Sequence, residues 1–166
     1  RGNSVYLVDR VVPMLPEHLS NGVCSLRPNE EKFTFSAVFE MNESAKVVNE
    51  WFGKTVIKSA RRFSYEEAQE IIETGEGDYK NEILLVDRLA KKLRKERMKE
   101  GALEVQSTEI RFELNVAGFP VKVLKKTTKD SNKLIEEFML LANKHVGFFV
   151  GDPKRQPRVT YIYRVH

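Results

Sequence analysis

Carboxylates are the side chains from which a hydrolytic metal centre could be built, and their spacing in this sequence does not favour one. Two-metal phosphoryl chemistry uses a tight group of carboxylates to hold cations about 3.5–4 Å apart. The aspartates of the chain are few and no two are close neighbours: Asp9, Asp78, Asp87, Asp130 and Asp152. The residues themselves therefore predict no catalytic side chain and no metal ligand.

The histidines and the cysteine do not add such a centre. His18, His145 and His166 fall in a proline-rich segment, in a predicted helix and at the last residue, without the spacing of metal ligands. Cys24 is the single cysteine, so no disulfide can form within the chain. We expect it to be a small buried apolar residue in a reducing, cytoplasmic protein.

A pair of adjacent carboxylates lies in the most apolar stretch of the chain. Glu136 and Glu137 occur within LIEEFMLLA, which we predict to be a buried helix. A buried carboxylate needs either a hydrogen-bonding or charged partner or a functional role. Lys133 and Lys144 could pair with Glu137. Glu136 could make a structural hydrogen bond or contact a ligand, and the pattern leaves both open.

Basic and aromatic side chains adjoin each other at one point of the sequence. Arg61 and Arg62 are followed by Phe63 and Tyr65. Phosphate neutralisation combined with base stacking is how single-stranded nucleic acid is bound. Such residues more often form the core and rim of an ordinary fold. A second basic cluster, within 91–99, is typical of a solvated helix face.

The elements that must position these residues follow from periodicity and end signals. Helices are expected at 64–73, 81–100 and about 132–149. Ser64 and Glu67 form a capping box at the start of the first helix, Gly75 and Gly77 end it, and Gly101 follows the second.

Strands are expected where apolar residues alternate, at 33–41, 46–57, 109–115, 120–124 and 158–165. In the first strand, the phenylalanines at 33, 35 and 39 should form a half-buried face. The first thirty residues look irregular, with a turn at Asn21-Gly22, yet are apolar enough to pack against something. The sequence therefore predicts an α+β fold, in which mixed, largely antiparallel strands pack with three helices.

Composition sets the class of protein. The chain has 166 residues, 41% of them hydrophobic, with a formal net charge of +4. No apolar run approaches the roughly 20 residues that span a bilayer, so no membrane is expected. The mildly basic balance is compatible with a polyanionic partner. Without an initiator methionine or a signal peptide, we expect an internal piece of a longer cytoplasmic protein.

Several stretches resemble the ribonuclease R/II (RNB) family of exoribonucleases. The segment RGNSVYLVDRVVPMLPEHLSNGVCSLRPNE at 1–30 resembles the region after the family's aspartate motif. FTFSAVFEM, ARRFSYEEAQ, GALE, LIEEFMLLAN and the closing YRVH follow in the family's order. The resemblance covers nearly the whole chain, and bacterial ribonuclease R looks nearer than ribonuclease II. It implies that residues 1–166 are a single partial domain, the central part of the RNB catalytic domain. The aspartate motif would lie before this part and the catalytic arginine motif after it.

What the resemblance implies is processive hydrolysis of RNA from its 3′ end to nucleoside 5′-monophosphates with Mg²⁺. Tyr6 matches an aromatic residue that stacks on the 3′-terminal nucleotides. Tyr65 and Glu136 match a pair that contacts ribose and favours RNA over DNA. This fits their chemistry, since the 2′-hydroxyl is both donor and acceptor and a phenol and a carboxylate can read it. Val105 stands where some relatives carry a second stacking aromatic, so a two-sided aromatic clamp does not follow.

These expectations lead to distinct functions. In the first, the parent protein is an exoribonuclease that takes a single-stranded 3′ end, and this piece lines the RNA channel but is inactive alone. In the second, the piece is a non-catalytic RNA-binding module of an inactive relative. In the third, it is a packing module without RNA contact. Tyr6, Tyr65 and Glu136 are the predicted RNA-binding residues, with Arg61 and Arg62 as weaker candidates.

Overall fold

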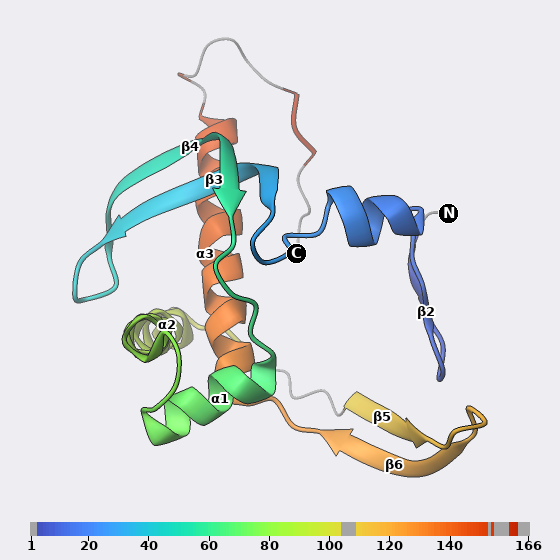
Figure 1. Ribbon diagram of the computed structural model, residues 1–166. Coiled ribbons are helices and arrows are strands. Elements are labelled where there is room, and N and C mark those ends of the chain that lie inside the picture. Colours follow the sequence, from blue (N-terminus) through green and yellow to red (C-terminus); the bar gives the residue numbers. More distant parts are fainter. Residues whose placement is uncertain (1–2, 104–108, 153, 155–159, 163–166) are drawn as a thin grey trace. The chain divides into compact units, whose positions relative to one another are not determined.

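The computed structural model describes residues 3–103, 109–152, 154 and 160–162 (Figure 1). The chain forms two compact units. Unit 1 comprises Arg1–Thr34, Val56–Arg62 and Leu103–Thr128. Unit 2 comprises Phe35–Thr55, Phe63–Ala102 and Lys129–His166. The division runs through strands β3 (Glu31–Met41) and β4 (Val47–Lys58).

In unit 2, the first helix begins and ends where its local signals predicted. Helix α1 covers Tyr65–Thr74. The Glu67 backbone N–H donates to Ser64 Oγ at 3.2 Å, and the Ser64 N–H donates to Glu67 Oε2 at 2.7 Å. These two bonds confirm the capping box. Gly75 ends the helix in the left-handed region at φ 72°, a conformation that costs glycine little.

Helices α2 (Lys80–Lys99) and α3 (Asp130–Gly151) complete a three-helix packing, and both lie within two residues of their predicted bounds. The three helices pack pairwise against one another. Each contributes one buried apolar side chain: Ile71 from α1, Ala90 from α2 and Leu134 from α3. Ala90 is small, which lets the backbones of neighbouring helices approach closely. The core of unit 2 therefore lies between the helices.

The hairpin of β3 and β4 docks on the last part of α3, whereas α1 and α2 pack on its first part (Figure 1). Phe52 of β4 lies 4.5 Å from Phe149 of α3, and Phe39 of β3 lies 5.2 Å from His145, measured between ring centroids. The turn between β3 and β4 places Ala45 in the left-handed region at φ 61°.

The predicted burial of two apolar faces was wrong. Phe33 and Phe35 are 93% and 84% exposed, whereas Phe39 packs against His145 of α3. Helix α3 was expected to be buried nearly all round, but Met139 and Phe148 are 59% and 67% exposed. Among the described residues, α1, α2 and the hairpin cover only part of the α3 surface.

Unit 1 begins with a short antiparallel pair, β1 (Val5–Tyr6) and β2 (Val11–Val12), in which Tyr6 is opposite Val11. The irregular segment that follows contains a π-helix, η1 (His18–Val23), where a turn at Asn21-Gly22 was predicted. Cys24 caps this π-helix and is exposed, which corrects the expectation of a buried thiol. The reason is that no residue of η1 is buried, so this segment forms no core that could cover the thiol.

Strands β5 (Glu109–Leu114) and β6 (Pro120–Lys126) confirm the two strands expected at 109–115 and 120–124, and they pair as an antiparallel hairpin. Asn115 Oδ1 accepts hydrogen bonds from the N–H groups of Ala117 and Phe119 at 3.0 and 2.9 Å, which closes the turn. Of the predicted strand at 158–165, the structure describes 160–162, and these three residues lie outside any strand.

The α+β fold class is confirmed by these elements: antiparallel strand pairs and, in the described part of the chain, three α-helices. Among the same residues, no helix is both long enough and apolar enough to cross a membrane.

Candidate functional site

Tyr65 and Glu136 lie on two helices that are tied together by buried polar groups. The Ser131 N–H of α3 donates to Gln69 Oε1 of α1 at 3.0 Å, and the two residues are 2% and 6% exposed. Tyr65 precedes Gln69 by one turn, and Glu136 follows Ser131 by about one and a half turns. At about 100° per residue, Glu136 points to another side of α3 than Ser131, and it contacts Arg97 of α2.

Both side chains are available to a ligand. Tyr65 is 48% exposed, and the Glu136 side chain is 50% exposed. Tyr65 is the first residue of α1, directly after the capping residue Ser64. Its backbone is therefore fixed by the capping box, while its ring remains accessible.

The neighbouring Glu137 has the opposite environment, since its side chain is 3% exposed. Successive helical residues point about 100° apart, so one of the pair can face a neighbouring helix while the other faces outward. Arg97 of α2 binds Glu137 with two atoms: Nε donates to Oε2 at 3.1 Å and Nη2 donates to Oε1 at 2.5 Å. Arg94 adds a third contact, from Nη1 to Glu137 Oε1 at 3.5 Å.

Arg97 also reaches the exposed member of the pair, because its Nη2 lies 3.3 Å from Glu136 Oε1. From the sequence, Lys133 and Lys144 were the candidate partners of Glu137, and these arginines were not singled out. A signal was present: Arg94 and Arg97 follow the buried Ala90 by four and seven residues, on the apolar side of α2. Arginines on that side must meet an anion or water.

A second ion-pair network joins the start of α3 to α2. Lys91 Nζ lies 2.8 Å from Asp87 Oδ2 and 3.1 Å from Asp130 Oδ2. The Asp87 carboxylate, followed by that of Asp130, holds the pKa of Lys91 above its ordinary value of 10.5. The predicted solvated basic face thus contains at least one lysine that crosslinks helices. Lys99, by contrast, pairs within the helix with Glu96 at 2.8 Å, which lowers the pKa of Glu96.

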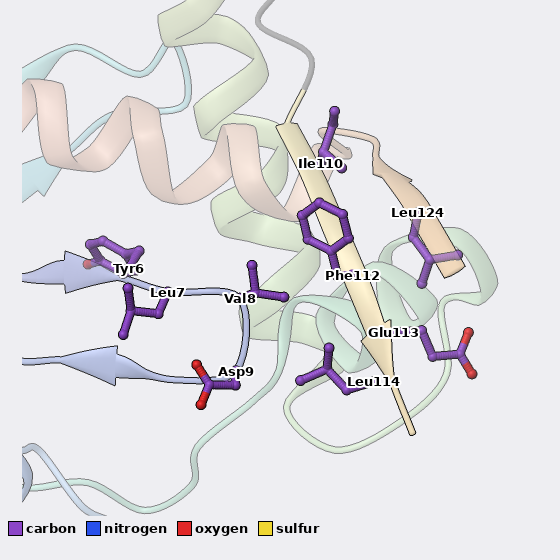
Figure 2. Close-up of a pocket in the computed structure, with 9 residues that line it drawn as sticks. All are labelled: Tyr6, Leu7, Val8, Asp9, Ile110, Phe112, Glu113, Leu114 and Leu124. Atoms are coloured by element: carbon purple, nitrogen blue, oxygen red, sulfur yellow. The ribbon is translucent and has the colours of Figure 1, made fainter. Parts of the chain in front are cut away.

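Tyr6 belongs to unit 1, where its ring is 79% exposed at the edge of a hollow of about 690 Å³ (Figure 2). The lining mixes polar and apolar surface and comes from the first hairpin and from β5 and β6: Tyr6, Leu7, Val8, Asp9, Ile110, Phe112, Glu113, Leu114 and Leu124. An exposed aromatic ring beside such a hollow can stack on another planar group.

The structure gives few side-chain contacts for the remaining candidate residues. Arg61 and Arg62 are both exposed in unit 1, and Ser59 Oγ donates to the Arg61 carbonyl at 3.2 Å. Val105 and His166 lie outside the described residues. His145 is held against Glu50 of β4, with 2.5 Å between Nδ1 and Oε2, which makes it a structural contact of α3. In the part of the chain that the structure describes, no three His, Cys, Asp or Glu side chains are grouped to hold a metal ion.

Comparison with known proteins identifies the family. The family model described as RNB domain matches residues 1–166. The chain belongs to the RNB family. It is 41% identical over 163 residues to the DIS3-like exonuclease 2 of Schizosaccharomyces pombe, covering 89% of this chain and 18% of that protein. It is 34% identical to ribonuclease R 1 of Lactococcus lactis, covering 100% of this chain and 21% of that protein. The chain thus spans about a fifth of the length of these relatives.

Solved structures agree with this RNB assignment. The RNase R of Mycoplasma genitalium in complex with double-stranded RNA superposes with a TM-score of 0.84 at 25% identity, over 92% of this chain and 28% of that chain. Yeast Ssd1, described as a pseudonuclease, superposes with a TM-score of 0.66 at 19% identity, over 90% of this chain and 18% of that chain. The second likeness shows the fold alone.

Proposed function

We propose that this chain lines part of the RNA channel of an exoribonuclease that degrades RNA processively from the 3′ end and releases nucleoside 5′-monophosphates. The observation that carries the proposal is the RNB match over residues 1–166, together with relatives named as exonucleases and ribonuclease R. The related RNase R of Mycoplasma genitalium was solved with single-stranded and with double-stranded RNA, which supports RNA as the partner. We place the parent protein in the cytoplasm.

In this proposal, Glu136 and Tyr65 read the ribose. The Glu136 carboxylate accepts a hydrogen bond from the 2′-hydroxyl, and the Tyr65 phenol can donate to it or accept from it. The exposure of both side chains supports this assignment. Tyr6 stacks on a base near the 3′ end, while Arg61 and Arg62 neutralise phosphates.

Hydrolysis in the parent protein would use Mg²⁺, which activates water and neutralises charge on the phosphate. The described residues of this chain offer no group of ligands that fits such an ion. We therefore assign the ligands to other parts of the parent protein. The work of this chain is to bind and orient RNA.

The test compares RNA with DNA of the same sequence as substrate for the full-length protein. Glu136→Ala and Tyr65→Phe should lower the ratio of the two degradation rates about tenfold, because a hydrogen bond to a charged group contributes roughly 1.5–3 kcal/mol. Tyr6→Ala should weaken RNA binding and lengthen the final product. Glu70→Ala, an exposed carboxylate on α1, is the matched control. If none of the three changes affinity, product length or RNA preference, the assignment is wrong.

The same experiment separates catalysis from binding alone. An exoribonuclease releases nucleoside 5′-monophosphates from labelled RNA in the presence of Mg²⁺. A full-length protein that bound RNA through these residues and released no nucleotide would instead be a non-catalytic member of the fold, as Ssd1 is described to be.

A further inference from the structure

We propose that Arg97 is a positioning residue that holds Glu136 in the orientation needed to read a ribose, and so sets part of the preference for RNA over DNA. The inference rests on the proposed function, because it assigns to Arg97 an effect that passes through Glu136. It assigns Arg97 no contact with RNA. The juxtaposition that carries it is one guanidinium shared between a buried and an exposed carboxylate.

The guanidinium is anchored on its buried side. Glu137, with 3% of its side chain exposed, accepts hydrogen bonds from both Nε and Nη2 of Arg97. A planar guanidinium that meets a carboxylate in this way is fixed in both position and plane. Arg97 itself is 28% exposed, so its other side reaches the surface.

The exposed side of the same guanidinium meets Glu136. Nη2 lies 3.3 Å from Glu136 Oε1, which leaves Oε2 able to accept a hydrogen bond from a ligand. An exposed glutamate on a helix otherwise samples many rotamers, and binding must then restrict it. Arg97 removes part of this freedom before the ligand arrives, which favours binding.

The length and shape of arginine are needed for this arrangement. Lysine places a single charge at the end of a flexible chain and cannot hold Glu137 at two points while touching Glu136. Arg97→Lys should therefore keep the charge and lose the orientation. This separates a positioning effect from a general electrostatic one.

The experiment measures the RNA-to-DNA ratio of degradation rates for the full-length protein, together with its midpoint of urea denaturation. We expect Arg97→Met to lower the ratio about three- to tenfold and Arg97→Lys to restore only part of it. In the Glu136→Ala background, Arg97→Met should change the ratio no further. Lys91→Met is the matched control: it removes another α2–α3 ion pair, to Asp130, and should lower the midpoint while leaving the ratio unchanged.

The outcomes distinguish the two proposals. If Glu136→Ala leaves the ratio unchanged, the ribose-reading function fails, and the role of Arg97 fails with it. If Glu136→Ala lowers the ratio but Arg97→Met does not, only the positioning role is wrong. The positioning role would also be wrong if Arg97→Met lowered the RNA-to-DNA ratio equally in the wild-type protein and in the Glu136→Ala background. Should Arg97→Met fail to fold, Arg97→Gln keeps an N–H donor of similar reach, and the same comparison in the Glu136→Ala background decides.

Discussion

Glu137 carries a charge inside the contact between α2 and α3. With 3% of its side chain exposed, its carboxylate has lost most of its water and depends on Arg97 and Arg94 for compensation. The adjacent Glu136 keeps half of its side chain exposed and depends on water as well as on Arg97. The two adjacent glutamates therefore differ in what they do: Glu137 holds two helices together, and Glu136 remains accessible to a ligand.

Glu137→Gln should destabilise the fold far more than Glu136→Gln. Breaking a buried pair leaves uncompensated charge and costs roughly 3–5 kcal/mol, whereas an exposed substitution usually changes stability by about 0.5 kcal/mol or less. The urea midpoints of the two full-length variants, measured against wild type, would show the difference. Equal midpoints would mean that the buried carboxylate does not hold the helices together.

The sequence indicated which glutamates matter but not how they are held. LIEEFM marked Glu136 and Glu137 because charged residues stood among apolar ones. Their shared partner Arg97 lies 39 and 40 residues away along the chain, on a helix whose rotation about its axis is set by packing. Such a pairing is a property of the tertiary structure, and local pattern cannot supply it. The burial of Cys24 was mispredicted for the same reason.

Elements whose ends are fixed by local chemistry were predictable. The Ser64 capping box and the Gly75 end of α1 depend on hydrogen bonds within a few residues. Which face of an element is covered depends on what packs there. The phenylalanine face of β3 and much of α3 were therefore predicted as buried and are exposed.

The contact between α2 and α3 should depend on pH through Lys91. A raised pKa means that the folded state holds the proton more tightly than the unfolded chain does. The stabilisation is therefore fully present below the ordinary value of 10.5 and is lost as the pH rises through the higher value of the folded state. The difference in urea midpoint between wild type and Lys91→Met should stay constant from about pH 7 to 9 and shrink above about pH 10.5. A difference that grew above this pH would contradict the assignment.

At the scale of the whole chain, the two units differ in how much they bury. The buried apolar side chains among the described residues, Ala45, Ile71, Ala90 and Leu134, all belong to unit 2. Unit 1 is built from two-stranded hairpins and a π-helix, and an isolated hairpin of this kind is marginally stable in water. We therefore expect unit 1 to depend on further protein for its stability.

For the isolated 166-residue chain, hydrogen exchange should be slow in α1, α2 and α3 and fast in β1, β2, β5 and β6. Slow hydrogen exchange in β5 and β6 would show that unit 1 is stable without further protein.

The isolated 166-residue chain should show no Mg²⁺-dependent degradation of single-stranded RNA. Its RNA binding should be weak and should fall as salt is added, because Arg61 and Arg62 are the proposed phosphate contacts. Robust degradation of RNA would show that the isolated chain is active.

The division of labour between Glu136 and Glu137 also offers a handle for protein engineering. A library that varies position 136 explores nucleotide selectivity on a scaffold that remains intact, because that side chain faces outward. Position 137 has to stay fixed in such a library, since a change there would remove folded clones before their selectivity could be scored. Enzymes with an altered sugar preference, including ones that accept modified oligonucleotides, are therefore to be sought by diversifying one member of the pair and conserving the other.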